Sequence, residues 1–132
     1  MTSALEAVQQ QLVTRLNAHV ALSDLIGGIF DGPPPRATFP YIGLATGASL
    51  DWSHKGAVGR ELSLALTAHD DGATAARLHR VMALVEEALE PGLDDPVGWQ
   101  IVTFDFRRTR ILRRATSPWS GLLEYRARVL RL

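Results

Sequence analysis

Four side chains able to do chemistry stand close together in the stretch "LDWSHKGAVGRE", residues 50–61. Asp51, Ser53, His54 and Lys55 supply an acid, a hydroxyl nucleophile, a base and an amine. A hydrolase holds its nucleophile, the base and the group that orients the base within hydrogen-bond distance, and known triads draw them from separate parts of a fold. Here they are neighbours in one strand or turn, where successive side chains diverge, and no G-x-S-x-G elbow accompanies them. We therefore expect no catalytic residue and no enzyme.

A second polar group, His69, Asp70 and Asp71 together with His79, contains residue types that bind metal ions. Its spacing is poor, because His69 ends a predicted strand and His79 lies on the polar flank of a predicted helix. Capping of that helix by the aspartates explains the acids without a metal. The chain has no cysteine, no Walker loop and no dinucleotide-binding glycine motif. We expect neither a metal site nor a cofactor.

The C-terminal part of the chain is rich in arginine. A basic surface with Phe106, Trp119 and Tyr125 nearby could follow phosphates and stack bases, so a small nucleic-acid-binding module stays open as an alternative. Against it, the isoelectric point of the chain is about 6.9, and Phe106 and Tyr125 fall on the predicted core face. A surface that faces solvent or a partner protein is the favoured interpretation. The basic residues are Arg107, Arg108, Arg110, Arg113, Arg114, Arg126, Arg128 and Arg131.

The formal net charge is zero, but the charges are divided unevenly along the chain. Residues 1–99 carry 6 Arg and Lys against 12 Asp and Glu, which gives −6. Residues 100–132 carry 8 against 2, which gives +6. If the two parts reach different surfaces, these complementary charges favour head-to-tail self-association.

The length and composition are those of one folded domain covering residues 1–132, with 46% hydrophobic and 21% charged residues. No apolar run approaches the ~20 residues that span a bilayer. The N-terminal sequence lacks the basic start and the hydrophobic stretch of a signal peptide. We expect synthesis in the cytoplasm and no membrane association.

The first predicted element is a helix over residues 4–21. Ser3 and Glu6 have the spacing of a capping box, and apolar residues then recur at steps of three and four. A short turn at 23–26 follows, and then a connector with three consecutive prolines, which we expect to be ordered and partly extended as polyproline II.

Two antiparallel strands are predicted next, in "PYIGLATGASL" and "RELSLALTAH". Their connection, roughly residues 49–57, is longer than the two to five residues common in hairpins, and such loops are often functional. A second helix starts at Asp70, Asp71 or Gly72 and ends at Pro91-Gly92. The strands "WQIVTFDFRRTRIL" and "GLLEYRARVLRL" form a second hairpin.

The order α-β-β-α-β-β predicts an α+β fold, a four-stranded antiparallel sheet with two helices packed on one face. In the last hairpin we expect the two phenylalanines to face the core and the acid between them to face outward, opposite an arginine. The predicted register pairs Phe104 with Val129, Phe106 with Ala127 and Asp105 with Arg128.

Beyond these patterns, one part of the chain resembles a known family. The segment "ALEAVQQQLVTRLNAHVALSDLIGGIFDGPPP", followed by "FPYIGLATGASLDWSHKG", is similar to the tail terminator (tail completion) proteins of long-tailed phages and gene transfer agents. The resemblance is weaker through the rest of the chain, and its motifs are structural. The matching residues are Leu25, Gly28, Phe30, Asp31, Gly32, Phe39, Pro40, Tyr41, Gly43, Asp51, Trp52 and Ser53.

The resemblance implies a structural particle protein that forms a ring of six copies on the end of the tail tube, at the head-tail junction. Such a ring stops polymerisation of the tube subunit and offers a surface to the head-connector proteins. DNA would pass through it without sequence-specific binding. A head-completion or stopper protein of the same particle is the alternative. The residues we expect at interfaces are Asp51, Trp52, Lys55, Arg107, Arg126 and Arg128.

Overall fold

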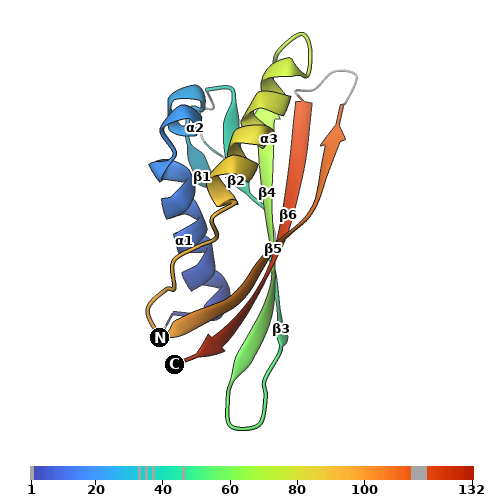
Figure 1. The fold of residues 1–132 in the computed structure, drawn as a ribbon. Coiled ribbons are helices and arrows are strands. Elements are labelled where there is room, and N and C mark those ends of the chain that lie inside the picture. The colour runs from blue at the N-terminus through green and yellow to red at the C-terminus, as the bar shows by residue number, and fades with distance from the viewer. Residues whose placement is uncertain (1, 33, 35, 37, 46, 114–118) are drawn as a thin grey trace.

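The computed structural model describes residues 2–32, 34, 36, 38–45, 47–113 and 119–132. Within these residues it has three helices and six strands (Figure 1). The expected α+β class is confirmed, but the prediction of four strands and two helices is wrong in detail. The elements are α1 (Ala4–Ala18), α2 (Val20–Leu25), β1 (Ile29–Asp31), β2 (Tyr41–Leu44), β3 (Ala48–Asp51), β4 (Gly59–Asp70), α3 (Ala76–Leu89), β5 (Trp99–Leu112) and β6 (Trp119–Arg131).

The strands form one sheet in the order β1-β2-β4-β6-β5, and β3 also pairs with β4. The predicted strand over 40–50 is divided in two. Its first part, β2, pairs antiparallel with the C-terminal end of β4, with Tyr41 opposite His69. Its second part, β3, pairs with the N-terminal end, with Ala48 opposite Ser63. The two parts therefore lie along the same edge of β4.

The added strand β1 lies within the predicted connector and pairs in parallel with β2. Hydrogen bonds from Gly27 N–H to Pro40 O (2.7 Å) and from Ile42 N–H to Gly28 O (3.0 Å) hold the connector against β2. The expectation of polyproline II falls partly on residues 33 and 35, which lie outside the described residues. The connector is ordered at its ends by backbone pairing.

The predicted first helix is two helices. Ser3 caps α1 as expected, its Oγ accepting from Glu6 N–H at 3.2 Å. At His19 the backbone leaves the helical region, and the ring Nδ1 accepts from Leu22 N–H at 3.3 Å to start α2. The predicted turn at 23–26 is thus the end of a short helix.

The predicted start of the second helix at residues 70–72 is wrong, because Asp70 is the last residue of β4 and α3 begins at Ala76. Asp70 is fully buried and accepts hydrogen bonds from Arg77 Nε at 2.9 Å and Nη2 at 2.5 Å. The acid therefore binds an arginine of the first turn of α3 and does not cap it.

The helices cover one face of the sheet, as Figure 1 shows, and the opposite face carries no helix among the described residues. Alternation along β4 and β6 separates the two faces. Residues such as Leu66 and Leu123 face the helices and are buried, whereas their neighbours on the outer face are more exposed. The largest fully buried side chains are Leu12, Leu16, Leu22, Ile42, Leu62, Leu66, Leu78, Leu89, Leu123, Val8, Val81 and Val85.

The predicted register of the last hairpin is wrong by two residues. Phe104 lies opposite Ala127, and Phe106 lies opposite Tyr125. β-Bulges between Ile101 and Thr103 and between Phe106 and Arg108 shift the pairing along β5. A shift of two keeps every side chain on its face, so Phe104 points toward the core side as expected. The remaining pairs of the prediction change accordingly, and Asp105 faces Arg126 instead of Arg128.

Among the described residues, no helix combines the length and the apolar character that a bilayer crossing requires.

Candidate assembly surfaces

The β3–β4 hairpin projects past the body of the molecule, with its tip beyond both chain termini (Figure 1). Trp52 N–H donates to Gly59 O at 3.0 Å, and His54 and Ala57 exchange two backbone hydrogen bonds of 3.0 and 2.9 Å. Lys55 and Gly56 therefore form a two-residue tip, in which Gly56 has φ +84°. The predicted long loop over 49–57 is wrong, because most of it is a paired hairpin.

The hydroxyl of Ser53 serves this hairpin. It donates to Asp51 Oδ1 at 2.6 Å and accepts from Gly59 N–H at 3.1 Å. The hydrogen bond from Ser53 is the main cause that lowers the pKa of Asp51, and Arg60 at 3.4 Å adds to it. His54 instead packs its ring edge-on against Trp52, with 4.4 Å between ring centroids. In the part of the chain that is described, neither His54 nor Lys55 is hydrogen-bonded to the Ser53 hydroxyl, which donates to the Asp51 carboxylate.

The outer face of the sheet carries a row of acidic and basic side chains that begins beside Trp52. We call this row the outer-face ladder, and it consists of Trp52, Glu61, Asp105, Arg126 and Arg128. The Arg128 guanidinium lies 5.5 Å from the Trp52 ring centroid, and its Nε donates to Glu61 Oε1 at 3.1 Å. Arg126 lies 3.7 Å from the same oxygen and 3.5 Å from Asp105 Oδ2. The ladder therefore joins β5, β6 and β4 to the hairpin.

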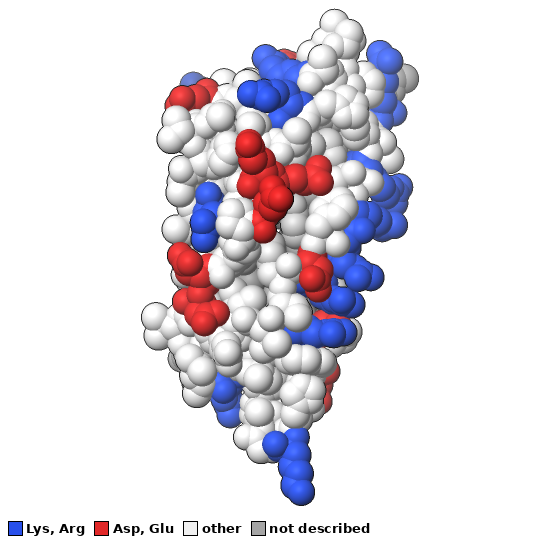
Figure 2. Space-filling model, viewed as in Figure 1, with Lys and Arg blue, Asp and Glu red and all other residues white. Residues whose placement is uncertain are grey.

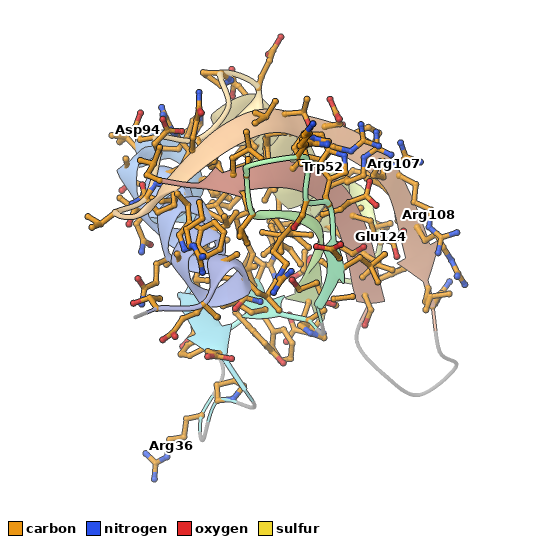
Figure 3. All side chains as sticks on the ribbon, turned by 90° about the horizontal axis from the view of Figure 1, so that it is seen from below. Arg36, Trp52, Asp94, Arg107, Arg108 and Glu124 are labelled. Atoms are coloured by element: carbon orange, nitrogen blue, oxygen red, sulfur yellow. The ribbon has the colours of Figure 1, made fainter. Side chains whose placement is uncertain are left out.

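Arg107 sits beside this ladder, at the second bulge of β5. It lines a hollow of about 320 Å³ together with Glu61, Arg126 and Glu124. Glu124 is held by the neighbouring Arg108. Figure 3 shows Trp52, Arg107, Arg108 and Glu124 on one side of the molecule.

Four of the six predicted interface residues are thus brought to one face, namely Trp52, Arg107, Arg126 and Arg128. The other two belong to the hairpin. Asp51 is bound to Ser53 and Arg60, and Lys55 is exposed at the tip. Their role in an interface remains a prediction.

The residues weighed as a metal site do not converge. His69 and Asp70 are successive residues of β4 and point to opposite faces of the sheet. His69 stacks on Tyr41, with 4.7 Å between ring centroids, while the Asp70 carboxylate is bound by Arg77 and His79 is exposed on α3. Among the residues that the structure describes, no group of three or more His, Cys, Asp or Glu is placed to hold a metal ion.

A groove of about 670 Å³ lies between α3 and the strands β5 and β6, and we call it the α3–β5 groove. Aromatic rings form its floor. Phe104 stacks on Tyr125 at 5.1 Å between centroids, and Phe106 meets Tyr125 edge-on at 5.7 Å. Burial, and secondly the charge of Glu86, raise the pKa of Tyr125 to about 12.

Carboxylates line the rim of the groove. Glu86 is exposed on α3 and Glu90 is exposed at its C-cap, and Glu87 between them lies 3.3 Å from His19 Nε2. Arg80 also lines the groove, so three carboxylates and one guanidinium lie along it. The groove is therefore acidic at its rim and apolar at its floor.

Alternation along the strand predicts Phe106 in the core and so does not reveal this groove, whereas the side chain is 48% exposed. The sequence carries little signal for this, because the exposure depends on the order of the strands. β5 is an edge strand and α3 packs over β4 and β6, so the flank of β5 that holds Phe106 is left open.

The charges that are divided unevenly along the sequence are also separated on the surface. Figure 2 shows Asp and Glu gathered over α3 and near the segment that follows it, and Lys and Arg along the side formed by β5. The acidic α3 side and the basic β5 side are therefore two separate surfaces of opposite charge, as complementary head-to-tail contacts require.

Comparisons with protein-family models and with solved structures both find matches for this chain. The family model described as "Tail completion protein gp17" matches residues 10–130. Among solved structures, the chain is similar to a component of the "Virion of native gene transfer agent (GTA) particle", with a TM-score of 0.85 and 26% sequence identity. That match covers 98% of this chain and 99% of the other. A search of curated proteins finds no significant match.

Proposed function

The chain belongs to the tail completion protein gp17 family and is a virion structural protein, and from this premise we propose that it closes the tail tube as a ring. In this proposal six copies sit on the last ring of the tube, at the head-tail junction of a phage-like particle. One face stops addition of tube subunits, and the other receives the head-connector proteins. DNA passes through the opening without base-specific contacts.

The observation that carries the proposal is the likeness to a gene transfer agent virion component, which extends over nearly the whole of both chains. Because each chain is covered almost completely, the whole fold is matched, and this supports incorporation of the present chain in such a particle. A family of structural tail proteins also argues against an enzymatic role.

The distribution of surfaces supports a ring. Contacts between copies in a ring are heterologous, so each copy needs two different complementary surfaces. The acidic α3 side and the basic β5 side are two such surfaces (Figure 2). The long edge strand β5 and the projecting hairpin add further contact area at opposite edges of the sheet.

The nucleic-acid alternative gains no support from the outer face. Arg126 and Arg128 bind Glu61 and Asp105, and Arg108 binds Glu124. These arginines are already neutralised by carboxylates on adjacent strands, so phosphates would have to compete with them. The pattern suits a protein interface better than a phosphate track.

The experiment is a tube-growth assay with the tail tube subunit of the same particle. When the protein is added to growing tubes at a lower concentration than the tube subunit, the tubes should become shorter. The protein should appear at one tube end in electron micrographs. The double variant R126E/R128E, which breaks the outer-face ladder, should shorten tubes less. The matched control is R36E, because Arg36 is exposed in the connector and lies away from Trp52 and Arg107 in Figure 3. Tubes of unchanged length, with binding to the head connector alone, would instead identify a stopper protein.

A further inference from the structure

Lys55 at the tip of the β3–β4 hairpin is the one lysine in the sequence. The reciprocal bonds of His54 and Ala57 fix the turn that presents it. All four residues of β3 are exposed, so the hairpin is a paired but uncovered arm that ends in a positive charge.

The α3–β5 groove has the opposite character. In the described residues Glu86 and Glu90 make no ion pair. The rim therefore offers two free carboxylates above a floor of aromatic rings. An ammonium group on an apolar stem suits such a groove, because the stem packs on the rings while the charge meets the carboxylates.

The tip and the groove cannot meet within one chain. In this part of the sheet the strand order is β3, β4, β6, β5, which puts the hairpin and the groove at opposite edges. Tyr125 in the groove floor lies opposite Leu64, and Lys55 precedes Leu64 by nine residues. At the rise of a strand, nine residues extend roughly 30 Å.

We propose that the hairpin tip of one copy docks in the α3–β5 groove of the next copy, with the Lys55 ammonium between Glu86 and Glu90 and its stem on Phe106. This contact is heterologous, so repeating it closes a ring or continues as a chain of copies. The inference rests on the proposed ring and names the surfaces that join its members.

Carbodiimide coupling, which links an amine to a carboxylate in direct contact, tests the contact. Rings assembled from equal amounts of ¹⁵N-labelled and unlabelled protein are cross-linked and digested. We expect peptides in which a labelled Lys55 segment is joined to an unlabelled α3 segment at Glu86 or Glu90. The N-terminal amine gives a different peptide and is not confused with Lys55.

Charge reversal gives a second readout. Lys55→Glu or Glu90→Lys alone should raise the dissociation constant of the assembly roughly tenfold, and the two together should restore it. Asp24→Lys is the matched control, because Asp24 is exposed on α2 and makes no ion pair among the described residues. It should leave assembly unchanged.

Rings that form normally, without these cross-links and without a response to the reversals, would overturn the inference and leave the proposed ring standing. Cross-links from Lys55 to added tube subunit alone would overturn it as well and assign the hairpin to the tube. A chain that stays monomeric under all conditions would overturn the ring and this contact together.

Discussion

Replacing Trp52 by alanine should loosen the hairpin without unfolding the protein. The Trp52 indole lies under the Arg128 guanidinium, 5.5 Å from the ring centroid, and packs edge-on against His54 with 4.4 Å between ring centroids. An exposed cation–π contact contributes about 0.5–1 kcal/mol. An aromatic pair contributes about 0.5–1.5 kcal/mol. Their loss, about 1–2.5 kcal/mol together, raises the opening equilibrium of the hairpin roughly 5- to 70-fold.

Amide hydrogen exchange measures this opening directly. The reporters are the N–H groups of Trp52, His54 and Ala57, which donate across the hairpin. Their protection should fall by the stated factor in Trp52→Ala, whereas amides in the centre of β4 and β6 keep theirs. Trp52→Phe, which retains an aromatic ring beside His54, should lose less.

Equal protection of these three amides in the native protein and in Trp52→Ala would refute the argument, since the ring would then contribute nothing to hairpin order. A uniform loss across the whole sheet would refute it differently, because Trp52 would be part of the global core.

Three further predictions concern the hairpin backbone, the packing under α3 and the response to pH. A Cβ at residue 59 would lie 2.4 Å from the Trp52 carbonyl oxygen, so Gly59→Ala should abolish the exchange protection of the hairpin; retained protection would contradict the close approach. A Cβ at residue 121 would lie 2.4 Å from Met82 Sδ, so Gly121→Ala must displace the flexible Met82 side chain and should lower the free energy of unfolding by about 1 kcal/mol in urea titrations. Gly43→Ala, where the added atom has ordinary contacts, is its matched control, and equal stability of both variants would contradict this packing. Burial lowers the pKa of His69 from 6.5, so the unfolded chain binds the proton first and the stability from neutral His69 is lost as the pH falls below that value. The urea midpoint of His69→Gln should therefore fall less than that of the native protein between about pH 7.5 and about pH 5.5; an unchanged slope in His69→Gln would exclude His69 as the cause.

Several elements could be predicted from local sequence because a local interaction determines them. Ser3 caps α1 as expected, and alternation along β4 and β6 places their core faces correctly. The face of Phe104 follows from the same alternation, even though its partner does not.

The other features of the fold depend on contacts between residues distant in sequence, or on hydrogen bonds that no sequence pattern marks. Helix α1 ends at His19 without a glycine or proline, because a histidine ring nitrogen caps the next helix. Strand β1 has only three residues and forms because β2 supplies its partner. The two bulges of β5 have no glycine to mark them, so pairing counted from residue types alone misses them.

The candidate surfaces were predictable only where local alternation along a strand determines them. Arg126 and Arg128 alternate on one strand, so a shared face was evident, but their common partner Glu61 is 65 or more residues earlier in the chain and depends on the β4–β6 pairing. Asp70 was predicted to cap a helix. It is instead the last residue of β4, bound by Arg77, and this contact forms only because β4 extends to residue 70.

Native mass spectrometry of the purified protein, alone and with the tail tube subunit, tests the central claim most directly. The account predicts a closed species of six times the 14.4 kDa chain mass, present alone or formed on addition of the tube subunit. A protein that remains monomeric in both conditions, at the highest concentrations that stay in solution, would contradict it.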